Sequence, residues 1–376
     1  MTAILNTLCL MVMAIEISAA KWKVASLSSG ASKLRMKTLE QEGAAERFEA
    51  LLAEIVLARK ALLVPEGARV LVAYEAGTEG FWLVRALWAA GIEAEVIDPV
   101  SLQVDRRARR VKTDRVDAEA LVRALWRHGC GELRALNMLR VPSTDAEDSR
   151  EWQRARDRLA AARRGGVDRM VKKLRTQGIW PLPKTWRADL RAEGLRTFFG
   201  KSLGPLLSKS LQMELERVEQ IEQKLKELEQ QLDHLDPEAR RRIEGLQQLR
   251  GIGATGARAL ATTLYWRTFK NRREVGACVG LVGTPYDSGT MRQDQGISKC
   301  GDPKLRGLLV ELSWLWLRYQ PQSALTQWFN QRTEGGGKRH KRVMIVAVAR
   351  KLAIALWRYL KDGVIPEGAR LKRQAA

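Results

Sequence analysis

The stretch Arg69-Val70-Leu71-Val72-Ala73-Tyr74-Glu75 decides the fold of the first part of this chain. Its unbroken apolar run is typical of a strand that is covered on both faces, as the central strands of parallel sheets are. An acid that ends so apolar a strand has few structural reasons to be there. Glu75 is therefore a candidate functional residue.

Strands and helices alternate around this stretch in a definite order. Before it we expect three strands, near residues 12–17, 22–26 and 34–39, and a helix near residues 44–60. After it we expect a helix, a strand and a second helix. This is the element order of a ribonuclease-H-like fold. We expect residues 1–130 to form an α/β domain built on a mixed sheet.

Four acids fall on the elements where that fold gathers acids. Glu16 lies in the first strand, Glu75 ends the fourth, and Asp114 and Asp117 open a later helix, three residues apart and so on one face. Mg²⁺ takes one or two carboxylates per ion, so four acids suit two ions that hold the attacking and leaving oxygens at a phosphodiester. Taken singly, Asp114 and Asp117 are better explained as a helix cap and a first-turn acid.

The formal net charge of +22 predicts a polyanionic partner, because such self-repulsion opposes compaction unless something neutralises it. Lys and Arg occur in nearly every segment from Arg106 to Arg373, whereas binding to a membrane surface needs one basic amphipathic helix. We expect nucleic acid and no membrane. Lys112 and Arg110, just before the acidic pair, would meet phosphates of the scissile strand.

Cysteine spacing and the start of the chain indicate a cytoplasmic protein. The four cysteines are far apart and suggest neither a zinc site nor a disulfide framework. The apolar run 8–17 lacks the positive region of a secretory signal and contains Glu16, which favours a buried strand. No segment reaches transmembrane length.

Residues 131–207 form an Arg-rich connector with interspersed tryptophans, and Gly165-Gly166, Pro181 and Pro183 are expected to break it. Guanidinium groups and indoles stack on bases and also meet phosphates, so this connector is a candidate RNA contact. A solvated helical connector explains the same composition equally well.

Between Ser208 and Asp236, apolar residues recur at steps of three and four: Leu211, Leu215, Val218, Ile221, Leu225, Leu228, Leu232 and Leu235. This spacing predicts a coiled-coil linker helix over 208–240. Self-association to a dimer or tetramer is one use of such a face. An intramolecular helical hairpin is the alternative.

A mostly helical domain is expected over residues 241–376. Near its start, Gly251 and Gly253 lie in a pattern that resembles a helix-hairpin-helix, where glycines let backbone N–H groups approach a phosphate. A Gly-rich stretch follows at 280–301, then three helices, with a basic loop at 335–342 before the last.

Two sets of motifs together resemble one family. Met13-Ala14-Ile15-Glu16-Ile17-Ser18, Tyr74-Glu75-Ala76-Gly77 and Lys112-Thr113-Asp114-Arg115-Val116-Asp117-Ala118 look like the acidic domain of bridge-RNA-guided insertion-sequence transposases. The C-terminal part resembles the same family through Gly251-Ile252-Gly253, Gly280-Leu281-Val282-Gly283-Thr284-Pro285-Tyr286-Asp287-Ser288-Gly289 and Ile297-Ser298-Lys299-Cys300-Gly301-Asp302.

The resemblance implies a recombinase with a RuvC-like acidic site and a serine domain, in which a bridge-type guide RNA pairs with donor and target DNA. Carried over by position, Glu16, Glu75, Asp114 and Asp117 would bind Mg²⁺, and Ser288 would form a phosphoserine link that conserves bond energy for rejoining. Arg292, Lys299 and Arg306 would stabilise charge on the phosphate, although plain surface charge explains them equally well.

The residues themselves support Ser288 only weakly, because Asp-Ser-Gly is an ordinary turn sequence and no histidine lies within twenty residues. Its activation would have to come from the metal site, across domains or subunits, and Ser298 is a competing serine. The chain has Glu16 where the family pattern has Asp, which moves the carboxylate by roughly 1 Å. A hydrolytic nuclease that uses only the acids, and a nucleic-acid-binding scaffold, are the rival interpretations.

Overall fold

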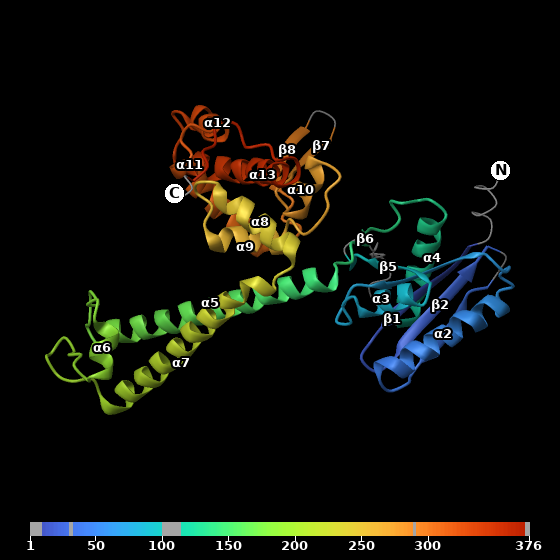
Figure 1. Cartoon of the computed structure of the whole chain (residues 1–376), viewed down its shortest axis with the longest axis horizontal. Helices are drawn as coiled ribbons and strands as arrows, with labels where there is room; N and C mark the ends of the chain where they lie inside the picture. The colour runs from blue at the N-terminus through green and yellow to red at the C-terminus, as the bar shows by residue number, and fades with distance from the viewer. Residues whose placement is uncertain (1–9, 30–32, 100–113, 289–290, 373–376) are drawn as a thin grey trace. The chain divides into compact units, whose positions relative to one another are not determined.

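The computed structural model describes residues 10–29, 33–99, 114–288 and 291–372, and it divides the chain into two compact units, Met1–Pro142 and Ser143–Ala376 (Figure 1). Each unit has its own hydrophobic core.

The first unit contains a six-stranded mixed sheet with the order β3-β2-β1-β4-β5-β6. Its strands are β1 Leu10–Ile17, β2 Trp22–Ser28, β3 Arg35–Leu39, β4 Arg69–Glu75, β5 Glu93–Ile97 and β6 Met138–Leu139. β1, β4 and β5 run parallel, and the other neighbours pair antiparallel. The predicted mixed α/β fold is confirmed. β6 was not predicted, and it lies beyond the boundary expected at residue 130.

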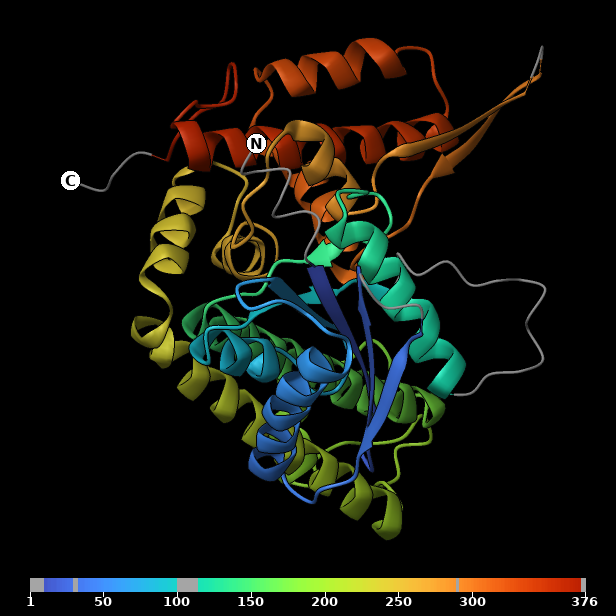
Figure 2. The same ribbon diagram turned by 90° about the vertical axis from the view of Figure 1, so that its right-hand side faces the viewer.

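Helices cover both faces of this sheet. α2 Ala44–Ala61 and α3 Trp82–Ala89 pack on one face, and α4 Asp114–Gly129 packs on the other (Figure 2). The alternation of side chains along β1 divides it between the two cores. Met11, Met13 and Ile15 pack with α2 and α3, whereas Leu10, Val12 and Ala14 pack with α4.

A buried ion pair joins β3 to α2. Arg35 donates through Nε and Nη2 to the carboxylate of Glu54 at 2.7 and 3.1 Å, and Glu54 is only 2% exposed. The hydrogen bond to Glu54 raises the pKa of the Arg35 guanidinium. The two hydrogen bonds of this fork offset the cost of burying the carboxylate.

Replacing Arg35 by Met is expected to lower the free energy of unfolding by about 3 kcal/mol, because it leaves a buried carboxylate unpaired. Urea denaturation measures the loss, and the double variant Arg35→Met/Glu54→Leu should recover most of it. Arg69→Met is the matched control: its pair with Glu93 is about half exposed, so its loss should be below about 1 kcal/mol. Equal losses in Arg35→Met and Arg69→Met would contradict this account.

The second unit begins with a long antiparallel helical hairpin, formed by α5 Thr144–Thr176 and α7 Pro205–Gln230, with the short α6 Trp186–Arg191 between them (Figure 1). The prediction that Gly165-Gly166 breaks the connector is wrong, because both glycines lie inside α5. Gly166 lies where α7 comes closest: a Cβ there would be 2.5 Å from Val218 Cγ2. Glycine at residue 166 therefore permits the two helices to pack closely.

The periodic apolar face of α7 packs on α5 of the same chain. Leu211, Leu215 and Val218 are buried in one cluster with Met170 and Leu174 of α5. Ion pairs cross the same contact between Arg169 and Glu214 and between Arg156 and Glu229. The intramolecular hairpin therefore accounts for the spacing that also suggested a coiled coil.

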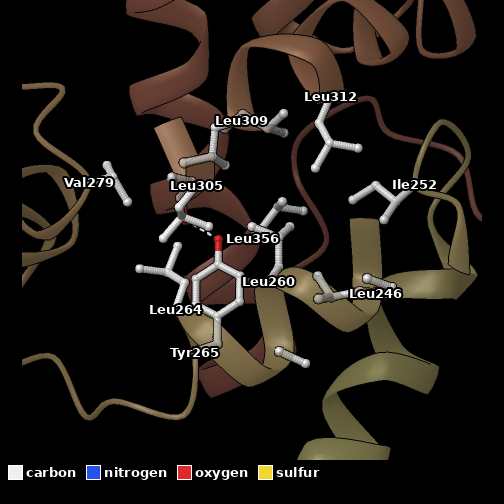
Figure 3. Close-up of a cluster of buried hydrophobic side chains, with 14 of the residues drawn as sticks. Leu246, Ile252, Leu260, Leu264, Tyr265, Val279, Leu305, Leu309, Leu312 and Leu356 are labelled. Carbon is white, nitrogen blue, oxygen red and sulfur yellow. Dashed lines mark hydrogen bonds between the residues drawn. The ribbon is translucent and has the colours of Figure 1, made fainter. Parts of the chain in front are cut away.

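The remainder of the second unit is mostly helical. After the short 3₁₀ helix Gln231–His234, its elements are α8 Pro237–Gln248, α9 Ala254–Thr263, α10 Arg272–Cys278, β7 Gly283–Ser288, β8 Met291–Ile297, α11 Pro303–Tyr319, α12 Ala324–Thr333 and α13 Lys338–Asp362. Leucines from α8, α9, α11 and α13 surround Tyr265, whose hydroxyl donates to the Ala353 carbonyl at 2.9 Å (Figure 3). Burial raises the pKa of Tyr265.

Two details of this domain differ from the sequence-based expectation. The Gly-rich stretch 280–301 contains a β-hairpin, β7–β8, with no strand predicted there. The basic residues from Lys338 belong to the first turns of α13, which starts directly after Gly337, so the predicted basic loop is short. Within the described ranges, no helix is long and apolar enough to span a bilayer.

Candidate active site

Glu16 and Glu75 lie side by side in the sheet. The parallel register of β1 and β4 pairs Ile15 with Tyr74, so the next position on each strand is Glu16 and Glu75. Both acids continue the rows of residues that face α4, which contain Ala14 on β1 and Ala73 on β4. Both are half-buried. Two carboxylates therefore project from adjacent strands on the same face, at the same edge of the sheet.

The start of α4 lies at this edge. At the other end of the helix, a Cβ on Gly129 would be 2.8 Å from Leu10 Cδ2 and 3.7 Å from Leu71 Cδ2, so α4 ends over the beginnings of β1 and β4. Ala118 and Leu121 are buried against the same face of the sheet. α4 thus runs opposite to β1, and its N-terminal residues Asp114 and Asp117 lie toward the ends of the strands that carry Glu16 and Glu75.

The side chains of these acids are of the type that binds a divalent cation. Carboxylate oxygens are hard ligands, and Mg²⁺ needs only one or two of them, with water and phosphate oxygens completing its shell. Asp117 is half-buried, and the side chain of Asp114 lies outside what the structure describes. Among the described side chains, no group of three acids, histidines or cysteines by itself forms a metal site. Lys112 and Arg110 lie outside the described residues.

One cation beside the acids was missed by the sequence interpretation. Lys23 on β2 is paired directly with Glu16 across the antiparallel ladder, as Ala25 is with Ala14. Directly opposed residues point to the same face, so Lys23 also belongs to the face that α4 covers. The signal in the sequence was weak, because β2 carries apolar residues on both faces and the importance of Lys23 depends on the register with β1.

Ser288 is the last residue of β7, where it pairs with Met291 of β8, and Arg292 pairs with Asp287 one step further from the turn. The hairpin projects from the helical domain in Figure 2. The side chains of Ser288 and Arg292 are outside the described part. Ser288 therefore lies at the turn end of a two-stranded ribbon.

The opposite end of this hairpin is a narrow neck, defined here as residues 278–282 and 298–301. Gly280 and Gly301 both have positive φ, 66° and 82°, and a Cβ on either would overlap a carbonyl oxygen of the facing segment. Backbone hydrogen bonds run from Lys299 to Gly280 at 3.1 Å and from Ser298 to Val282 at 2.8 Å. Burial raises the pKa of the Cys278 thiol in the neck.

Lys299 lies in the neck, and Arg306 of α11 is bound to it. Arg306 Nη1 donates to the carbonyls of Val279 and Cys300, both at 3.2 Å. A strand rises about 3.3 Å per residue, so the length of β7 separates the neck from Ser288 by roughly 17 Å. The structure thus brings Arg292 close to Ser288 in the ladder, and it does not bring Lys299, Arg306 or the competing Ser298 there.

Gly251 and Gly253 lie in the turn between α8 and α9. Gly251 has φ 87° and packs against the Leu315 carbonyl, and Gly253 is the exposed residue before the first turn of α9. The turn is held by Gln320 Nε2, which donates to the Arg250 carbonyl at 3.0 Å, and by Lys372 Nζ, which donates to the Ile252 carbonyl at 3.0 Å. Ala254 and Thr255, the first residues of α9, are exposed.

Both halves of the chain match transposase families. Residues 13–177, which contain the four acids, match the DEDD family described as a transposase, and residues 243–328, which contain Ser288, match the family described as Transposase IS116/IS110/IS902.

Whole-chain relatives agree with these matches. The putative transposase y4rJ of Sinorhizobium fredii is 39% identical over 388 residues, which cover 99% of this chain and 97% of the relative. The transposase for insertion sequence element IS1328 of Yersinia enterocolitica is 27% identical over 78% of this chain and 85% of its own length. The chain belongs to the IS116/IS110/IS902 family of insertion-sequence transposases.

Proposed function

We propose that this transposase is a Mg²⁺-dependent, RNA-guided recombinase that cuts and rejoins donor and target DNA through a phosphoserine intermediate. The observation that supports it most is the placement of Glu16 beside Glu75 at the sheet edge where α4 begins. Acids that lie side by side at one edge of a sheet suit the metal-dependent cleavage of a phosphodiester. The second unit contributes Ser288, at the turn end of a β-hairpin.

Glu16, Glu75, Asp114 and Asp117 would hold the metal. Bound Mg²⁺ supplies electrostatic stabilisation of the oxygens around phosphorus. Lys23, directly opposite Glu16, would contact a phosphate of the DNA strand that is cut. Its positive charge would also offset the mutual repulsion of the acids.

Ser288 would make the covalent step. Its Oγ loses a proton and bonds to phosphorus, while one P–O ester bond breaks and the released sugar oxygen takes up a proton. A hydroxyl of the incoming strand then attacks the phosphoserine, and the Ser288 hydroxyl is restored. The number of ester bonds is unchanged over the two steps, so rejoining needs no external energy source.

The proposed partners are inferred from the net charge of the chain and from the presence of one Ser288 in each copy. A net charge of +22 suits two DNA duplexes and a folded guide RNA, which would choose the sequences by base pairing. Exchange between two duplexes cuts four strands, whereas each chain has one Ser288. We therefore include a dimer or tetramer in the proposal, formed by surfaces other than the face of α7 that α5 already covers.

Hydrolysis by the acids alone is the second candidate. The placement of Lys299 in the neck and of Arg306 against it favours this candidate, because neither cation is then available beside Ser288 of the same hairpin. In this version water attacks phosphorus, and Ser288 has no chemical role.

Denaturing gels separate the two mechanisms. Purified protein, RNA transcribed from the flanks of its element, and labelled donor and target DNA are mixed in Mg²⁺, with EDTA as the metal-free reference. We expect a protein–DNA adduct that Ser288→Ala abolishes and that the matched variant Ser298→Ala, in the neck, retains. Cleavage without an adduct in the unaltered protein would establish hydrolysis.

A further inference from the structure

The free end of the α5–α7 hairpin presents two phenylalanines on a closed turn. Thr197 N–H donates to the Lys201 carbonyl at 2.8 Å, and Gly200 N–H donates to Thr197 at 2.9 Å. Phe198 and Phe199 are the residues between these contacts, and they are 79% and 82% exposed. Their rings lie edge to face with centroids 5.4 Å apart.

The turn is fixed to the end of α5. Phe198 N–H donates to the Gln177 carbonyl at 2.9 Å. The adjacent Gly178 has φ 76°, and a Cβ there would be 2.5 Å from Phe198 Cβ, so only glycine permits this approach. The backbone of the turn is therefore ordered before a ligand binds, so binding would cost little further backbone entropy.

A third aromatic ring lies at the same end of the hairpin. Trp180 is 61% exposed, and the guanidinium of Arg175 lies 4.4 Å from its ring centroid. Together, Trp180, Phe198 and Phe199 are called the tip rings. Large aromatic side chains grouped in solvent mark an interaction site more often than chance exposure does.

Charge at the tip identifies the kind of partner. Residues 175–209 contain seven Lys or Arg and only two acids. Two of the cations, Arg187 and Arg191, pair with acids of α7, while Lys184, Lys201 and Lys209 are exposed. A surface that combines aromatic faces with excess positive charge complements unpaired nucleotides, which offer flat bases and phosphates together.

A small cavity adjoins the turn. It has a volume of about 290 Å³, and its lining combines apolar residues, Leu190, Leu195 and Leu203 among them, with the charged residues Glu193 and Lys209. This volume is at the lower end of the range for small-molecule pockets, so the cavity suits one planar group rather than a long ligand. A base extruded from a loop has that size and shape, and Lys209 would meet its phosphate.

We propose that the tip rings are a stacking platform for the unpaired bases of an RNA loop. This inference rests on the proposed function, since it assigns a surface to the guide RNA. Duplex DNA keeps its base faces inside the stack, whereas RNA loops expose them. The tip would hold the guide RNA by shape and stacking and would leave its pairing segments free.

The test compares loop and duplex binding by the full-length protein. The probes are a fluorescent stem–loop RNA with a single-stranded loop, and a fully paired RNA of the same stem. Phe198→Ala/Phe199→Ala should weaken stem–loop binding by roughly tenfold or more and leave duplex binding unchanged. Phe198→Tyr/Phe199→Tyr should bind normally. Leu206→Ala is the matched control, because Leu206 is 87% exposed at the same end but offers no ring.

Two results would overturn the platform. One is equal stem–loop affinity in the Ala variant and the unaltered protein. The other is loss of self-association in sedimentation by the Ala variant with RNA affinity intact, which would assign the tip to a second copy of the chain. The Ser288 adduct is measured separately, in the unaltered protein. If the adduct forms but the Ala variant binds the stem–loop normally, the recombinase proposal holds and the platform is wrong. If the Ala variant binds the stem–loop weakly but no adduct forms, the platform holds and the phosphoserine mechanism is wrong.

Discussion

Glu75→Gln is expected to lower the rate of DNA strand cleavage in Mg²⁺ about a thousandfold while the protein remains folded. The change preserves the size of the side chain and removes its charge. A metal ion stabilises charge around phosphorus by several kcal/mol, and losing roughly 4 kcal/mol of this stabilisation corresponds to a thousandfold change in rate. Glu75 ends β4 and is half-buried, so its replacement disturbs none of the buried residues Leu71 to Tyr74.

A matched control separates chemistry from folding. Glu93→Gln alters the same residue type in the same sheet, but Glu93 starts β5 and so lies at the opposite edge. There it pairs with Arg69 at 2.6 Å on the surface. We expect a stability loss below about 1 kcal/mol and normal cleavage. Normal cleavage by Glu75→Gln in a Mg²⁺ titration would remove Glu75 from the site.

The sheet of the first unit could be predicted because its signals are local. The apolar run at 70–73 and the helical periodicity at 44–60 each specify an element without reference to the rest of the chain. The adjacency of Glu16 and Glu75 could be expected only from the element order of a known fold. The register that places Lys23 opposite Glu16 is set by packing between strands, and neither strand encodes it alone.

Other features escaped the sequence because tertiary packing outweighs local preference. Gly165-Gly166 favours a helix break by propensity, yet α5 continues because α7 packs closely at Gly166. The strands β7 and β8 are mostly polar, with one glycine each, and they lack the alternation that marks a half-buried strand. The distance of Arg306 from Ser288 depends on this hairpin, so proximity in sequence was misleading.

Gly301→Ala is expected to destabilise the second unit by about 3–5 kcal/mol and to abolish the Ser288 adduct. A Cβ at residue 301 would overlap the Cys278 carbonyl oxygen, and the residue has φ 82°, where a side chain itself costs about 1–2 kcal/mol. Relief of the overlap requires the two sides of the neck to separate. Gly280→Ala should behave alike, because its Cβ would overlap the Cys300 carbonyl.

Gly307→Ala is the matched control for the neck. Gly307 lies in α11, and a Cβ there would meet nothing within 4 Å, so alanine should stabilise the helix by up to about 1 kcal/mol. Urea denaturation of the three variants measures stability, and the adduct assay is run at a temperature where each is folded. A folded Gly301→Ala chain that still forms the adduct would show that the neck does not position Ser288.

The reason to expect loss of the adduct even in folded protein is geometric. β7 and β8 pair with each other and are held to the helices at their base, through the neck and through Ile297 next to it, so a change of angle at residues 280 and 301 is carried along the ribbon to its end. Over a lever of roughly 17 Å, a tilt of about 10° moves Ser288 by about 3 Å. Displacements of 1 Å already lower the rate of reactions that depend on alignment by about a hundredfold. In the proposed mechanism the glycines of the neck would then be as necessary as Ser288, although they lie far from it.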